Sequence, residues 1–177
     1  MQRANKERPK IVSLILFGIY LLALTWSILF KLQFHLPYAL DNRVINLIPL
    51  MGSLNAVGIL SFGEITLNII AFAPFGIYSC MLKPSWPTLE RLAMIAGLSL
   101  TYEATQFIFA IGRADITDVL SNTLGGAIGI GIYALASLFL KDKTSKAATI
   151  TAAASTALVL IFAVGFMLTN RRWIMLR

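Results

Sequence analysis

The sequence predicts an all-α, polytopic integral membrane protein, a bundle of about five transmembrane helices in a single domain over residues 1–177. Of its residues, 58% are hydrophobic and 13% are charged, whereas an average soluble domain has about 45–50% apolar and about 25% charged residues. So few charged side chains cannot coat a soluble globule of this length, and the apolar residues gather in runs of membrane-crossing length. The composition therefore excludes an ordinary soluble protein.

Five apolar runs define the predicted spans. Residues 11–30 contain no charged side chain, and a helix of that length, at about 1.5 Å per residue, crosses a hydrocarbon layer of about 30 Å. Because the run is too long for a signal peptide and no small-residue cleavage site follows it, we expect an uncleaved anchor. Further runs lie at about 65–82, 92–111, 119–140 and 148–169. The last run is rich in alanine and threonine. The alternative for this run is that it does not cross the membrane.

The connections between the runs predict the orientation. The longest one, residues 31–61, contains Pro49 and several glycines, which argue against another span and favour a re-entrant or interfacial loop on the outer side. With five spans and the N-terminus inside, nine lysines and arginines lie inside and six outside. This excess predicts a multi-pass protein with a cytoplasmic N-terminus.

Polar residues near the helix ends are predicted to meet at the outer membrane face. They are Arg43, Asn46, Glu64, Asn68, Glu103, Gln106, Arg113, Asp115, Asp118 and Asn122. Spacings of three or four residues place those that share a helix on one face of it. A charge at the bilayer centre costs about 2.5–3.5 kcal/mol on insertion scales, so such groups need a partner or a function.

These residues form the candidate site. Its four carboxylates and two guanidiniums leave a surplus of two negative charges, which proton uptake, a bound cation, a cationic ligand group or water must balance. Structural alternatives remain: Asp115 as a helix cap, Asp118 as a first-turn acid and Arg113 as a loop anchor. Gly125 and Gly129, spaced as GxxxG, are expected to let another helix approach closely.

Four sequence stretches carry a family resemblance. Residues 101–126, TYEATQFIFAIGRADITDVLSNTLGG, contain a Glu-x-x-Gln, Asp-x-x-Asp, Asn and Gly-Gly order. With RVINLIP (43–49), EITLNIIAFAPFGIY (64–78) and FGIYLLALTWSILFKLQF (17–34), the chain resembles the VanZ-like membrane family over about residues 11–140. The resemblance implies a protein of the bacterial plasma membrane and low-level resistance to teicoplanin, a lipoglycopeptide that targets peptidoglycan precursors.

The resemblance carries over every candidate residue except Arg113. It leaves the run 148–169 outside the recognised core, as an extra C-terminal helix. Leu50 departs from the family, which commonly has an aromatic residue after the proline. The resemblance supplies no reaction.

Two mechanisms stay open for the site. In the first, it binds a lipid headgroup, a lipid-linked cell-wall precursor or the drug, with arginines on phosphate or carboxylate and Asn and Gln as neutral donors. In the second, an integral-membrane hydrolase or transferase uses Glu103 and Asp118 as acid and base on an envelope glycan or lipid headgroup. Asp115 and Glu64 are the further catalytic candidates, and a transporter would need polar groups deeper in several helices.

Metal and cofactor chemistry has little support in the sequence. One cysteine and one histidine are too few for the usual zinc, haem or iron–sulfur ligands. A Mg²⁺ or Mn²⁺ site on Asp115, Asp118 and Glu103 would lack a diagnostic ligand spacing. Most basic residues flank apolar runs, where they act as topology signals. We therefore expect no cofactor and no nucleic-acid partner, and leave the oligomeric state open.

Overall fold

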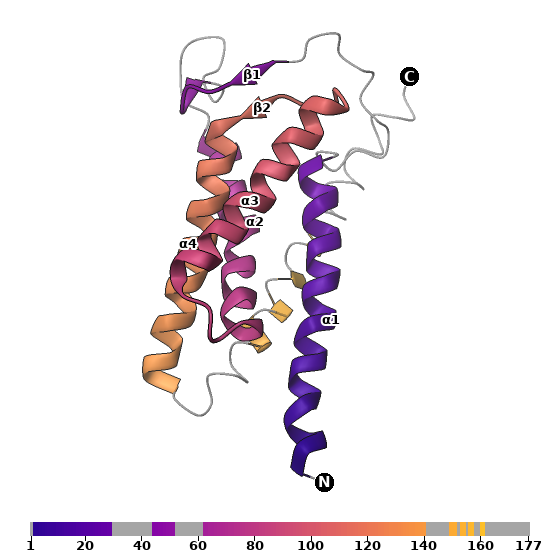
Figure 1. Cartoon of the computed structure of the whole chain (residues 1–177), viewed down its shortest axis with the longest axis vertical. Coiled ribbons are helices and arrows are strands. Elements are labelled where there is room, and N and C mark those ends of the chain that lie inside the picture. Colours follow the sequence, from indigo (N-terminus) through magenta and orange to yellow (C-terminus); the bar gives the residue numbers. More distant parts are fainter. Residues whose placement is uncertain are drawn as a thin grey trace.

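Long helices make up most of the described structure. The computed structural model describes residues 2–29, 44–51 and 62–140 and part of the segment 149–161, where the described residues are helical. The helices are α1 (Gln2–Leu29), α2 (Phe62–Leu82), α3 (Thr88–Ile108) and α4 (Ile116–Leu140). They form an elongated bundle in which α1 runs beside the other three (Figure 1). The predicted all-α fold is confirmed.

Among the described residues, three helical segments are long and apolar enough to cross a membrane. They are Ile11–Leu29 within α1, and the whole of α2 and α4. Helix α3 is as long as α2, at 21 residues, but its composition is more polar. The predicted run 148–169 is described only in part, so its crossing, the number of spans and the orientation stay predictions.

Helices α2 and α4 approach each other closely through glycine. A Cβ atom added to Gly125 would overlap the backbone of Ile69, and one added to Gly129 would overlap the backbone of Ala73. The contact positions rise together along both helices, so α2 and α4 run parallel. The close approach predicted from the GxxxG spacing is confirmed, and its partner is α2.

Aromatic side chains attach α1 to this pair. Tyr20 of α1 and Phe72 of α2 are fully buried, and the ring of Phe17 lies edge-on to that of Phe75 with centroids 5.4 Å apart. The Tyr20 hydroxyl donates to the backbone carbonyl of Ala71 at 2.6 Å. This bond attaches α1 to α2 at a residue three positions before Pro74.

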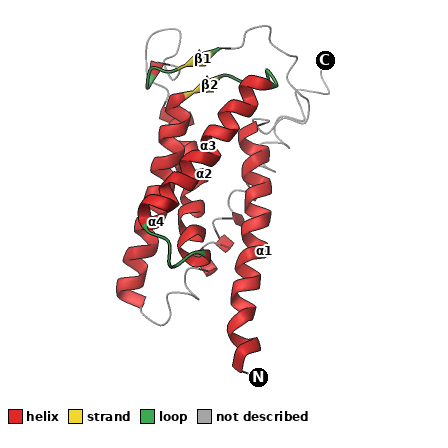
Figure 2. Ribbon diagram, viewed as in Figure 1, coloured by secondary structure: helices red, strands yellow, loops and turns green. Residues whose placement is uncertain are grey.

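A short parallel strand pair closes one end of the bundle. Strand β1 (Ile45–Asn46) pairs with β2 (Ala114–Asp115), so that Asn46 lies opposite Asp115. Figure 2 shows the strands at the end where α2 and α4 begin. The described part of the predicted re-entrant or interfacial loop, residues 44–51, is therefore attached to the start of α4.

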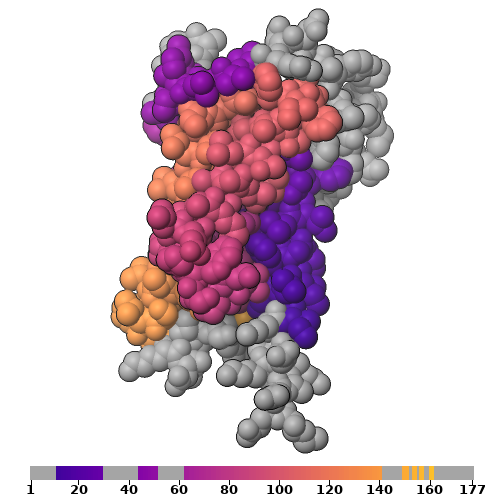
Figure 3. Space-filling model, viewed as in Figure 1, coloured from indigo at the N-terminus to yellow at the C-terminus, as the bar shows by residue number. Residues whose placement is uncertain are grey.

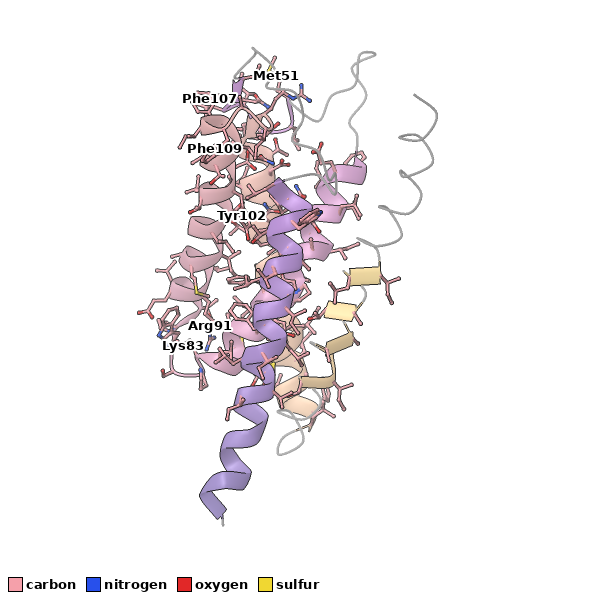
Figure 4. All side chains as sticks on the ribbon, turned by 90° about the vertical axis from the view of Figure 1, so that its right-hand side faces the viewer. Met51, Lys83, Arg91, Tyr102, Phe107 and Phe109 are labelled. Carbon is pink, nitrogen blue, oxygen red and sulfur yellow. The ribbon has the colours of Figure 1, made fainter. Side chains whose placement is uncertain are left out.

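Basic residues lie at the other end. Arg91 Nη2 donates to the carbonyl oxygens of Lys83 and Pro84 at 3.0 and 3.1 Å, and Lys83 Nζ lies 5.3 Å from the ring centroid of Trp86. Figure 4 shows Lys83 and Arg91 far from Met51, which lies at the strand end. The two ends of the bundle thus differ in chemistry.

Candidate functional site

Asp115 joins three segments at the strand end. Its Oδ1 accepts the backbone N–H of Thr117 at 2.8 Å, which caps the start of α4. Its Oδ2 accepts Nδ2 of Asn46 at 3.0 Å, and its own backbone N–H donates to Oε2 of Glu103 at 2.7 Å. Asp115 is therefore the helix cap that the sequence allowed, and it also brings together two further candidate residues.

Asp118 has a second asparagine partner. Asn68 Nδ2, from α2, donates to Asp118 Oδ1 at 2.9 Å and to Ser121 Oγ at 3.4 Å. Asp118 follows Asp115 by about one helical turn, and negative charge is favoured there by the helix dipole. Two carboxylates at the start of α4 thus each hold an asparagine from another segment. We call Asn46–Asp115 and Asn68–Asp118 the two Asn–Asp pairs.

Glu103 and Gln106 are both buried on one side of α3, as their spacing predicts. Gln106 Nε2 donates to the backbone carbonyl of Ile28 at 2.8 Å, near the end of α1. A Cβ atom on Gly112 would come within 3.1 Å of the Gln106 side chain. Gln106 therefore connects α1 to the turn between α3 and β2, next to the Asn–Asp pairs.

Asn122 lies one turn further into α4 and is only 1% exposed. Its Nδ2 donates to Ser99 Oγ of α3 at 2.8 Å, while its Oδ1 has no hydrogen-bond partner within the described parts of the chain. A buried polar atom without a partner costs about 1–3 kcal/mol. Asn122 thus joins α3 to α4 inside the bundle, below the Asn–Asp pairs.

Three candidate residues remain: Glu64, Arg113 and Arg43. Glu64 and Arg113 are exposed residues at the strand end, and Arg43 lies outside the described residues. In the parts of the chain that the structure describes, no group of three or more His, Cys, Asp or Glu side chains could hold a metal ion.

Sequence reasoning missed three hydroxyl residues at this site: Ser99, Thr117 and Ser121. The Thr117 side chain is buried, and its Oγ1 accepts the backbone N–H of Leu50 at 2.9 Å. Serine and threonine are common in membrane helices, so composition does not mark them. A signal did exist for Ser121, which follows Asp118 by three residues and so faces the same way.

Comparison with known proteins identifies the family. The VanZ/LLP1 family model matches residues 17–140, which is more than half of the chain and includes both Asn–Asp pairs. The chain belongs to the VanZ/LLP1 family. It is 39% identical to Protein VanZ of Enterococcus faecium over 136 residues, which are 76% of this chain and 81% of that protein. The VanZ/LLP1 match ends with α4, and no solved structure matches the chain.

Proposed function

We propose that this chain confers low-level resistance to teicoplanin by binding or acting on a cell-envelope lipid, a lipid-linked cell-wall precursor or the drug itself. Membership of the VanZ/LLP1 family supports the resistance role. One observation supports the site: the two Asn–Asp pairs lie about one turn apart at the start of α4, on its cap Asp115 and on Asp118. The site would face the outer side of the bacterial plasma membrane.

The Asn–Asp pairs suit a ligand that donates hydrogen bonds. An amide N–H partner positions a carboxylate but leaves its charge in place, and each carboxylate has about four acceptor sites. Sugar hydroxyls, amide N–H groups and ammonium groups are donors found on lipid-linked glycans and on glycopeptides. Charge-assisted hydrogen bonds to such groups are about twice as strong as neutral ones.

The geometry favours binding over acid–base catalysis by Glu103. The Glu103 side chain is buried, and its Oε2 already accepts the backbone N–H of Asp115. A general acid must come within about 2.6–3.2 Å of the atom it protonates. We therefore assign Glu103 the role of positioning Asp115, and assign ligand binding to Asp115 and Asp118.

The test is teicoplanin susceptibility in a bacterium that expresses the chain at equal membrane levels. Asp115→Asn and Asp118→Asn should each lose most of the resistance, because they remove the charge that binds donors. Glu90→Gln is the matched control, since Glu90 is an exposed acid in the first turn of α3, at the other end of the bundle. Full resistance in both aspartate variants would refute the proposal.

Glu103→Gln separates the two mechanisms. The glutamine Oε1 can still accept the Asp115 N–H, so a positioning residue should tolerate this change in part. An acid–base residue should not, and complete loss of resistance together with a new or missing envelope lipid would establish the hydrolase or transferase alternative. The same susceptibility measurement with a glycopeptide that has no lipid tail serves as the control for the drug.

A further inference from the structure

The segment Val44–Met51 exposes apolar side chains and turns its polar one inward. Its large apolar residues are 43–73% exposed: Val44, Ile45, Leu47, Ile48, Leu50 and Met51. The segment contains no charged residue, and Asn46 points to Asp115. Figure 3 shows it on the surface beside the start of α4. We call Val44–Met51 the apolar platform.

Hydrogen bonds hold the platform in a defined conformation. They run from Met51 N–H to Ile48 O at 3.2 Å, from Ile48 N–H to Asn46 Oδ1 at 3.2 Å, from Leu50 N–H to Thr117 Oγ1 at 2.9 Å and from Ala114 N–H to Val44 O at 3.1 Å. Leu50 also has a φ of 69°, a left-handed conformation that costs a branched residue free energy. The fold therefore holds these apolar side chains outward.

The platform continues the apolar surface of the helices beside it. Leu120 and Leu124 of α4, and Phe62 and Leu67 of α2, are all exposed close to the platform end. In a membrane protein such helix surfaces face lipid. A loop that faces water has the opposite pattern, with polar side chains outward, because exposed apolar area is unfavourable in water.

We propose that the platform inserts into the interfacial region of the lipid layer, with its side chains toward the acyl chains. The two Asn–Asp pairs then lie at the depth of the lipid headgroups. A ligand reaches them sideways from the lipid layer, with its lipid tail against the platform and its donor headgroup on the carboxylates. This inference rests on the proposed function and narrows the ligand to an amphiphile.

The first test measures the depth of the platform without reference to activity. Cys80 is the single cysteine of the chain, so Cys80→Ala gives a background for one nitroxide label. The label is placed by Leu47→Cys in the full chain, reconstituted into phosphatidylglycerol and phosphatidylcholine vesicles. Leu124→Cys on the lipid-facing side of α4 and Glu90→Cys, an exposed acid, are the controls.

Dissolved oxygen should speed the relaxation of the label at Leu47, and a water-soluble nickel complex should not reach this label. The label at Leu124 should behave in the same way. Nickel accessibility equal to that at Glu90 would overturn the proposal. So would dipolar broadening between labels at Leu47, because it would show that a second copy of the chain covers the platform.

The second test measures teicoplanin resistance. Leu47→Asn should lower it, whereas Leu138→Asn should retain it, since Leu138 is similarly exposed, 70% against 73%, but lies near the far end of α4. Equal resistance in the two variants would refute sideways entry over the platform. A lipid-inserted Leu47 with full resistance in both Asp115→Asn and Asp118→Asn would instead refute the proposed function and leave the insertion of the platform standing.

Discussion

Replacing Gly129 with alanine should force α2 and α4 apart and weaken the Asn68–Asp118 hydrogen bond. The added Cβ atom would lie 2.9 Å from the carbonyl carbon of Ala73 and nearer still to its oxygen. Both atoms belong to the backbone, so no side-chain rotation can relieve the overlap.

The magnitude follows from these contacts. Carbon atoms pack best at about 3.5–4.0 Å, so the helices must separate locally by about 0.6 Å or more. Overpacking of this kind costs about 1–3 kcal/mol. The same separation would stretch the Asn68–Asp118 bond, now 2.9 Å, toward the limit of hydrogen bonding.

Gly131→Ala provides the matched control on the same helix. An added Cβ there meets no atom within 4 Å, and alanine is favoured over glycine in a helix by about 1 kcal/mol. Because both variants gain this helix propensity alike, their free energies of unfolding in mixed micelles should differ by the overpacking cost alone, about 1–3 kcal/mol. Gly129→Ala should also lower teicoplanin resistance, and equal unfolding free energies would refute the packing argument.

Three further changes test other contacts in the same unfolding assay. Thr117→Val should lower the free energy of unfolding by about 1–3 kcal/mol and lower resistance, because the Leu50 N–H of the platform loses its acceptor. Thr117→Ser should keep both stability and resistance, and its failure to do so would contradict this. Tyr20→Phe should cost about 0.5–1.5 kcal/mol with resistance retained, and no change in stability would mean that the bond to Ala71 contributes nothing. Asn122→Leu alone should destabilise, whereas with Ser99→Ala it should match or exceed the parent; a double variant less stable than the single one would refute this.

The helices were predictable because length and one-turn spacing are local signals. The apolar runs gave α2 and α4 within a few residues of their bounds, and Glu103 with Gln106 do share a buried side of α3. Helix α1 begins at Gln2, well before the predicted span at 11. An apolar run marks the part of a helix that crosses lipid, whereas basic residues before it can still be helical.

The hydrogen-bond partners were not predictable, because they depend on contacts between distant segments. Asn46 could be placed only on the outer side, and its pairing with Asp115 depends on strands of two residues, too short for any periodic pattern. For Asp115 the sequence left a cap and a site residue as alternatives. The structure shows the cap, made by one carboxylate oxygen, and shows that the other oxygen accepts a hydrogen bond from Asn46, so capping does not use the whole carboxylate.

The strand pair also determines when the site can assemble during synthesis. Asn46 leaves the ribosome about 70 residues before Asp115, which is about 4–14 s at 5–20 residues per second. Helices α2 and α3 are synthesised in that interval, because both lie between the strands along the chain. Until then β1 has an unpaired edge. A nascent chain stalled before β2 should therefore be cleaved by protease within residues 44–51, and a chain stalled after α4 should be protected there.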